Sequence, residues 1–291
     1  MFFLYHRRSK PTGEVLAQAL GIDHGETTGA FVRAQAFDGG LIRWGSRVDT
    51  LVDAAVRVLN PVAAIERASH KLMSLEILRD RGIPVPDFDT DPEALVERAG
   101  YPILGRRIQH ARATDVVLCL QRRDWVRRPR DYYVAYVPTN REYRLHVAGG
   151  EVIRIQGKYL DVSPDYLPWV RNYATGHRFR APRRRLHMTR LEAAVAAVEA
   201  LGLDFGAVDL IVSDSGAHYV LEVNTSPSCS PRTGAAYVSS FARMLGISEE
   251  SLNFGALDML SPEQEERDSE DEVLGEESLV DREYEDTEVP Q

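Results

Sequence analysis

The chain has 291 residues, of which 44% are hydrophobic and 27% charged, an ordinary composition for a globular protein that is large enough to hold two compact units. No apolar run approaches the ~20 residues of a membrane-spanning helix, and the first apolar residues precede the basic ones, the wrong order for a secretory signal. Cys119 and Cys229 are too few for a disulfide framework or a zinc site, so we expect a reduced, cytoplasmic protein without a membrane partner.

The net charge of −9 is concentrated at the C-terminal end. Residues 261–291 hold 14 of the 44 Asp and Glu residues but 2 of the 35 Lys and Arg residues, which leaves 30 acidic and 33 basic residues before them. We predict that residues 256–291 form an acidic, disordered tail, because they have too few apolar residues to make a core. Its simplest role is to keep the protein soluble; the alternatives are that it covers a basic site or is itself a carboxylate-rich substrate.

The first 60 residues alternate between strand and helix signals. Two strands and two helices are predicted there, in the order strand 2–5, helix 14–20, strand 40–46 and helix 51–59. Gly21 ends the first helix, and Asn60-Pro61 ends the segment. This alternation predicts a small layer built on a parallel sheet.

The middle of the chain begins with a helix and continues with strands. The helix is predicted over 71–81, starting near Ser69 and stopping at Gly82, because prolines follow. Five strands are predicted after it, at 101–108, 116–120, 131–137, 142–147 and 151–155. Gly149-Gly150 joins the last two as a hairpin.

One more helix is predicted before residue 203. Thr189 and Glu192 have the spacing of a capping box at its start, and Gly202 closes it. Its apolar face is predicted to consist of Leu191, Val195, Val198 and Leu201.

The hairpin that follows this helix carries the most informative side chains. If Ser213 pairs with His218, Asp209 lies opposite Glu222 with the side chains about 5 Å apart. Asn224 shares the face of Glu222, because side chains alternate along a strand. Carboxylate and amide oxygens suit a hard cation such as Mg²⁺, above all when phosphates supply further ligands. The alternative is a solvated face that carries these residues by chance, and a slip of one residue in register would separate the two carboxylates.

Cations gather on the two strands that precede this hairpin in the sequence. Arg144 and His146 share one face of the first strand, and Arg154 and Gln156 share one face of the second. A cationic sheet face is what phosphoryl transfer requires, since the charge to be stabilised is spread over oxygens. Taken singly, each of these residues is equally compatible with a solvated surface.

The order of several short motifs resembles that of ATP-grasp enzymes. The motifs are Asn60-Pro61, Lys71, GIPVP at 82–86, YPILGR at 101–106, EYRLHV at 142–147, Arg171-Asn172, and Asp209 with Glu222-Val-Asn224. The match covers about residues 60–232 and resembles the carboxylate–amine ligases of phages and bacteria, which are related to ribosomal-protein glutamate ligases. It implies an α/β (α+β) protein of the ATP-grasp fold. Two β-sheet subdomains that grip ATP would occupy residues 61–255, after a small Rossmann-like N-terminal layer at residues 1–60.

The resemblance also implies how metal and phosphates are held. Asp209, Glu222 and Asn224 would bind one or two Mg²⁺ ions, with Mn²⁺ as an alternative. Lys71 matches the first phosphate-contacting lysine of the family, although a lone helix lysine is more often simply solvated. Arg106 stands in the place of the second lysine, and its planar fork of donors also suits phosphate.

The remaining implied site residues surround the nucleotide and the substrate. The interdomain hinge that reads adenine through its backbone would be Ala135, Tyr136 and Val137. Glu142 would bind the ribose. The groups around the phosphates and the substrate carboxylate would be Arg144, Lys158, Arg171 and Asn172.

Three positions depart from the family pattern. Residues 109–115 replace its small glycine-rich phosphate loop and contain no glycine, so we expect Arg112 and Thr114 to contact phosphates instead, or turnover to be slow. His70 stands where an acid is common, and Ala135 where many members have Glu.

Two arginine clusters, at 122–130 around Trp125 and at 183–185, raise the question of nucleic-acid binding. No nucleic-acid motif surrounds either cluster, so solvated loops are favoured and nucleic acid is not an expected partner. Either cluster could instead receive an anionic protein substrate.

The resulting hypothesis is an ATP-dependent carboxylate–amine ligase. ATP would phosphorylate a substrate carboxylate, and an amine would attack the acyl phosphate to give an amide, ADP and phosphate. The substrate would be an amino acid or peptide, or a protein terminus, with residues 225–232 lining the acceptor pocket. One alternative is a non-catalytic nucleotide-binding or structural protein that retains the fold, which the missing glycine loop favours. Another is an enzyme that adds amino acids to a macromolecule such as its own tail.

Overall fold

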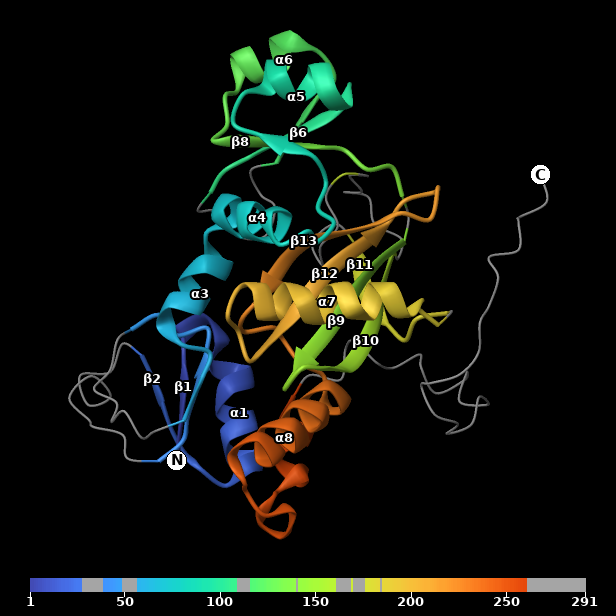
Figure 1. Ribbon diagram of the computed structural model, residues 1–291. Helices are drawn as coiled ribbons and strands as arrows, with labels where there is room; N and C mark the ends of the chain where they lie inside the picture. The colour runs from blue at the N-terminus through green and yellow to red at the C-terminus, as the bar shows by residue number, and fades with distance from the viewer. Residues whose placement is uncertain are drawn as a thin grey trace.

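The computed structural model describes residues 1–27, 39–48, 57–108, 116–139, 141–160, 169, 176–183 and 185–260. Within this part of the chain, three β-sheets follow one another along the molecule: a four-stranded N-terminal sheet, a five-stranded central sheet and a second four-stranded sheet at the far end (Figure 1). Among the described residues, no helix has both the length and the apolar character needed to span a bilayer.

The N-terminal sheet is parallel, as predicted, with the strand order β2-β1-β3-β4. Its strands are β1 (Phe2–Tyr5), β2 (Asp23–Glu26), β3 (Leu41–Trp44) and β4 (Val58–Leu59). The helix α1 (Lys10–Leu20) begins four residues earlier than predicted, with a proline in its first turn, and ends at Gly21 in the left-handed conformation. The prediction of a helix through residue 59 is wrong at its end, because β4 pairs with β3; residues 51–56 lie outside the described residues.

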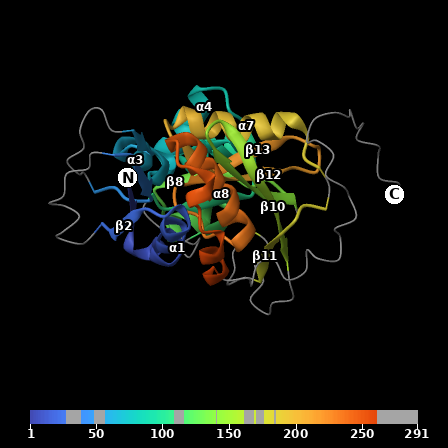
Figure 2. The same cartoon turned by 90° about the horizontal axis from the view of Figure 1, so that it is seen from below.

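The N-terminal layer shares its core with the C-terminal helices. Trp44 stacks on Phe205, with ring centroids 5.4 Å apart, and meets Tyr237 of α8 (Pro231–Leu245) edge-on. Figure 2 shows α1 beside α8. After the short helix η3 (Glu249–Ser251), Leu257 of η4 (Phe254–Met259) and the adjacent Leu260 are buried in the same core. The prediction that the disordered tail begins at residue 256 is therefore wrong, because Leu257 and Leu260 belong to this core.

Two helices follow β4, and the second of them is the helix predicted over 71–81, starting near Ser69. They are α3 (Val62–Ser69) and α4 (Lys71–Asp80), separated by His70. His70 has an extended backbone, and its Nδ1 accepts a hydrogen bond from the backbone N–H of Met73 at 3.1 Å. The break places Lys71 at the first position of α4.

The far sheet is antiparallel, with the order β5-β8-β6-β7. Its strands are β5 (Phe88–Asp89), β6 (Ile103–Arg106), β7 (Val117–Cys119) and β8 (Tyr132–Ala135). The helices α5 (Pro92–Ala99) and α6 (Arg122–Arg127) pack on it (Figure 1). The arginine cluster is thus partly helical rather than a loop, and Trp125 is buried in the core, stacked on Tyr101 with centroids 5.6 Å apart. Trp125 is therefore not available to stack on a nucleic-acid base.

The central sheet has the order β11-β10-β9-β12-β13 and is antiparallel throughout. Its strands are β9 (Arg141–Ala148), β10 (Glu151–Leu160), β11 (His177–Arg180), β12 (Phe205–Val212) and β13 (His218–Asn224). The helix α7 (Met188–Ala200) covers one face of this sheet. Its N-cap is His187 rather than Thr189. The buried residues of this helix are mainly alanines, and Leu191 and Val195 of the predicted apolar face are only half-buried.

The hairpin of β12 and β13 contains a bulge that changes the predicted register near the turn. Val212, not Ser213, pairs with His218, and Leu221 has no partner between the pairs Leu210–Val220 and Asp209–Glu222. This extra residue restores the predicted pairing of Asp209 with Glu222, which is confirmed.

Candidate functional site

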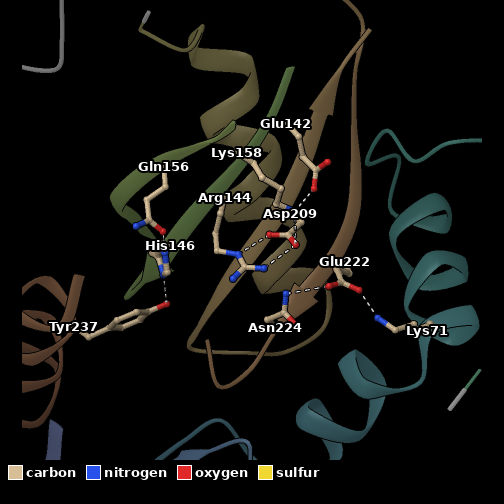
Figure 3. Close-up of polar contacts among 10 residues, drawn as sticks. All are labelled: Lys71, Glu142, Arg144, His146, Gln156, Lys158, Asp209, Glu222, Asn224 and Tyr237. Carbon is tan, nitrogen blue, oxygen red and sulfur yellow. Dashed lines mark hydrogen bonds and ion pairs between the residues drawn. The ribbon is translucent and has the colours of Figure 1, made fainter. Parts of the chain in front are cut away.

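The face of the central sheet opposite α7 gathers ionisable and amide side chains from four strands (Figure 3). Strand alternation sends their apolar neighbours, such as Leu145 and Val208, into the core beneath α7. The polar residues on the opposite face are Glu142, Arg144 and His146 of β9, Arg154, Gln156 and Lys158 of β10, Asp209 of β12, and Glu222 and Asn224 of β13.

Arg144 and Asp209 form a bidentate ion pair across β9 and β12. Arg144 Nε donates to Asp209 Oδ1 at 2.7 Å, and Nη2 donates to Oδ2 at 2.8 Å. Burial disfavours the charge on both groups, but their mutual attraction outweighs it: the pKa of Arg144 is raised and the pKa of Asp209 is lowered. Both side chains are therefore charged at neutral pH.

Lys158 lies between two carboxylates. It pairs with Glu142, its partner in the register of β9 and β10, and its Nζ lies 3.8 Å from Asp209 Oδ2. Lys158 and Glu142 are both buried. Burial opposes the charge on Lys158, but the two carboxylates raise its pKa above the ordinary value.

Glu222 is held by a lysine that comes from a helix. Lys71, at the start of α4, forms an ion pair with Glu222 Oε2, and Asn224 Nδ2 donates to Glu222 Oε1 at 3.2 Å. The attraction of Lys71, with a further contribution from Arg106, keeps the pKa of Glu222 far below its usual range despite burial. The α3–α4 break thus brings a cation to the edge strand of the sheet.

Phe179 of β11 was not anticipated from the sequence. Its ring centroid lies 4.4 Å from Arg144 Cζ and 5.3 Å from Lys158 Nζ, so one aromatic ring lies against both cations. Phe179 pairs in register with Lys158, which places its ring on the polar face of the sheet. Because β11 has only four residues, its sequence is too short to show a strand pattern that would predict the role of Phe179.

A neutral hydrogen-bonded network lies beside the charged cluster. His146 Nε2 and Gln156 Oε1 are 3.0 Å apart, and His146 Nδ1 lies 3.1 Å from the Tyr237 hydroxyl of α8. Since Gln156 Oε1 can only accept, the imidazole carries its proton on Nε2, and Nδ1 accepts from Tyr237. Burial lowers the pKa of His146 to about 3, so the ring is neutral and joins the N-terminal core to the site.

The oxygen donors of the site suit a magnesium ion that shares its coordination with phosphates. Asp209 and Glu222 supply carboxylates and Asn224 an amide on one face. No group of three or more His, Cys, Asp and Glu side chains among the described residues could hold a metal ion without other ligands. A pair of carboxylates completed by substrate phosphates is an arrangement that Mg²⁺ commonly uses.

The other predicted nucleotide-site residues lie at the ends of two strands of the far sheet or directly follow them. Arg106 ends β6, and Ala135 ends β8. The Ala135 N–H donates to Asp87 O and the Tyr136 N–H to Pro102 O, at 2.7 and 3.1 Å; Val137 follows them toward β9. The predicted residues Arg171 and Asn172, and the loop 109–115, lie outside the described residues.

The segment after β13 connects the site to the N-terminal layer. Ser9 Oγ donates to Ser226 Oγ at 2.9 Å, and Ser230 caps α8 by accepting from the N–H of Thr233. Cys229 is buried, and burial raises its thiol pKa well above the ordinary value, so it is an inert core residue rather than a nucleophile.

Comparison with known proteins identifies the fold. No protein-family model matches the chain. It is similar to the "Probable alpha-L-glutamate ligase" of Enterobacter sp. (strain 638), with 27% identity over 219 residues, 66% of this chain and 69% of that protein. A D-alanine–D-alanine ligase from Bacillus anthracis matches with a TM-score of 0.62 at 15% identity, covering 89% of this chain and 96% of its own.

A third similar protein was solved with its ligands. The ATP-grasp ligase PsnB, complexed with minimal precursor, Mg and ADP, matches with a TM-score of 0.55 at 15% identity and covers 78% of this chain and 89% of its own. These likenesses confirm the expected α/β ATP-grasp fold.

Proposed function

Since this chain is an ATP-grasp, carboxylate–amine ligase-like protein, we propose that it joins a carboxylate to an amine through an acyl phosphate and releases ADP and phosphate. The observation that carries this proposal is the polar face of the central sheet, where Asp209, Glu222 and Asn224 lie among the cations Lys71, Arg144 and Lys158. Transfer of a phosphoryl group needs oxygen ligands for a metal ion and also cations, because the charge of that group is spread over several oxygens.

The cations of the site would bind and orient the triphosphate. Lys71 and Arg106 come from the side of α4 and the far sheet, and Arg144 and Lys158 from the central sheet. ATP would thus be gripped between two sheets, with Ala135, Tyr136 and Val137 beside the adenine. Glu142 would accept from the ribose hydroxyls once Lys158 turns toward phosphate.

Magnesium, when bound with the nucleotide, would neutralise phosphate charge, and Asp209, Glu222 and Asn224 would hold it. The role of Arg144 would be to stabilise the oxygens of the transferred group, in an orientation fixed by the bidentate bond to Asp209 and by the ring of Phe179. Arg171 and Asn172 would complete the carboxylate site. No covalent protein nucleophile is needed, which agrees with the inert burial of Cys229.

An amino acid or a peptide is the proposed carboxylate or amine substrate. The glutamate ligase, the D-alanine–D-alanine ligase and the peptide-bound PsnB to which the chain is similar support this class. Ser226 and its neighbours would line the acceptor pocket, and a reduced cytoplasm, where ATP is available, would be the place of action.

The test is an ADP-release screen across amino acids and short peptides with Mg-ATP, with mass spectrometry on each positive mixture. We expect a product whose mass is the sum of two substrates less one water. The variants Glu222→Ala and Asn224→Ala should abolish ADP release, and full activity in either would contradict the proposal. Binding of Mg-ATP by calorimetry without any ADP release would instead support a non-catalytic nucleotide-binding protein.

Addition to the chain itself is tested separately. Intact-mass measurement after incubation with ATP and amino acids should leave the mass unchanged if the substrate is free. Discrete increments would identify the acidic tail or another part of the chain as the acceptor.

A further inference from the structure

Each carboxylate oxygen of the proposed metal site already accepts a hydrogen bond from this chain. Asp209 Oδ1 and Oδ2 accept from Arg144 Nε and Nη2 at 2.7 and 2.8 Å. Glu222 Oε1 accepts from Asn224 Nδ2 at 3.2 Å, and Oε2 accepts from Lys71 Nζ. A metal ion that binds either carboxylate must therefore share these oxygens with the donors already present and lie close to the positive charge of Arg144 or Lys71.

The charge of the cluster also opposes a metal ion that arrives alone. Three carboxylates, Glu142, Asp209 and Glu222, face Lys71, Arg144 and Lys158 in direct ion pairs. The positive charge of Arg106 also lowers the pKa of Glu222. A divalent cation would add to this balanced or positive cluster, whereas a triphosphate would offer its own oxygens to the cations.

We propose that Lys71 and Arg144 are resident counter-ions that exclude free divalent metal, so that metal and nucleotide enter the site only together. This inference rests on the proposed function. When the triphosphate binds, the cations exchange carboxylate for phosphate oxygens, and the carboxylates become available to the metal. No covalent bond forms or breaks in this exchange.

The two ion pairs differ in how easily they can open. Arg144 is held by two hydrogen bonds and by the ring of Phe179, and its side chain is 14% exposed. Lys71 donates a single ammonium group to Glu222, with both side chains about one quarter exposed, at 24% and 28%. The Lys71–Glu222 pair is therefore the one that opens first, and Lys71 is the residue that controls whether a metal ion reaches Glu222.

The experiment is a titration of the full-length protein with Mn²⁺, followed by the loss of the free-Mn²⁺ electron paramagnetic resonance signal. It is run with and without a non-hydrolysable ATP analogue, and a protein-free titration corrects for the Mn²⁺ that the analogue binds by itself. We expect the analogue to tighten Mn²⁺ binding by about tenfold or more in the wild type. The variant Lys71→Met should bind Mn²⁺ more tightly than the wild type when no nucleotide is present, while its affinity for the analogue falls.

Two variants serve as controls. Arg81→Met removes a positive charge from the exposed C-terminal end of α4 and should behave like the wild type. Glu222→Gln should bind Mn²⁺ weakly without the analogue, as the wild type does, and should lose most of the tightening that the analogue produces. A thermal melt of each variant without ligands checks that it is folded.

The outcomes separate this inference from the proposed function. Wild-type protein that binds the analogue, yet binds Mn²⁺ equally well without it, overturns the counter-ion role and leaves the ligase proposal standing. Equal or weaker nucleotide-free Mn²⁺ binding by folded Lys71→Met overturns it too. Absence of analogue binding under every condition refutes the proposed function itself. If Lys71→Met does not fold, the wild-type comparison decides alone.

Discussion

The ring of Phe179 lies 4.4 Å from the guanidinium carbon of Arg144, on the same sheet face as the Arg144–Asp209 ion pair. An aromatic face attracts a cation and also restricts the plane of the guanidinium group. Phe179 is thus a positioning residue: it orients Arg144 without replacing any of the hydrogen bonds of that side chain.

We expect Phe179→Leu to lower kcat/KM for ADP release by about tenfold, since a partly desolvated cation–π contact contributes on the order of 1–2 kcal/mol. Phe179→Tyr and Phe179→Trp keep an aromatic face and should retain most of the activity. A purely structural role would make the losses follow the melting temperature of each variant. Equal activity in Phe179→Leu and wild type would rule out the orienting role.

Removing one member of the Arg144–Asp209 pair should destabilise the protein more than removing both. Asp209→Asn leaves Arg144 and Lys158 without their shared carboxylate, and loss of one partner of a buried ion pair costs about 3–5 kcal/mol. The double variant Arg144→Leu/Asp209→Leu should recover part of that loss, as judged by urea unfolding. Arg243→Leu, which breaks an exposed pair with Glu151, is the control and should cost less than about 1 kcal/mol.

The sequence predicted the charged face of the hairpin although the register at the turn was wrong. Strict alternation from a Ser213–His218 pair places Asp209 opposite Glu222, but the observed pairing starts at Val212–His218. The extra residue, Leu221, corrects the difference before the carboxylates are reached. A bulge of this kind has no signature in an apolar run, because every neighbouring residue fits a strand.

Contacts between distant segments are what local patterns could not predict. The sequence pattern predicts that Lys71 lies on a helix, but its place at the start of that helix depends on the break at His70, where neither glycine nor proline stands. Phe179 and Tyr237 belong to segments more than 30 residues from Arg144, and their roles follow from strand order and helix packing. The packing of Leu257 against the N-terminal layer also joins segments that are far apart in the sequence, so local patterns did not predict it.

The stability of the protein should depend on His146 between pH 6.5 and about 3. Burial lowers the pKa of His146 to about 3 in the folded state, whereas an unfolded-chain histidine titrates near ~6.5. In this pH window the unfolded chain binds a proton at His146 that the folded protein does not bind. The contribution of the neutral imidazole to the free energy of unfolding is therefore complete above pH ~6.5 and is lost as the pH falls.

The measurement is urea unfolding at several pH values between about 6 and 4. His146→Asn should have a shallower slope of unfolding free energy against pH than the wild type, by up to about 1.4 kcal/mol per pH unit. Tyr237→Phe leaves the imidazole next to Gln156 and should keep the wild-type slope. Parallel curves for wild type and His146→Asn would show that His146 is protonated equally in both states.

Two truncations locate the end of the packed chain. Deleting residues 261–291 should leave the melting temperature nearly unchanged, because those residues have the composition of a solvated acidic tail. Deleting residues 256–291 also removes Leu257 and Leu260, which are 3% and 4% exposed in the core shared by α1 and α8. Each buried leucine contributes about 1.5–3 kcal/mol, so the longer deletion should lower stability by several kcal/mol. Equal melting temperatures for the two truncated proteins would show that the core ends before residue 256, and a large loss with the shorter deletion would show that the tail itself packs on the protein.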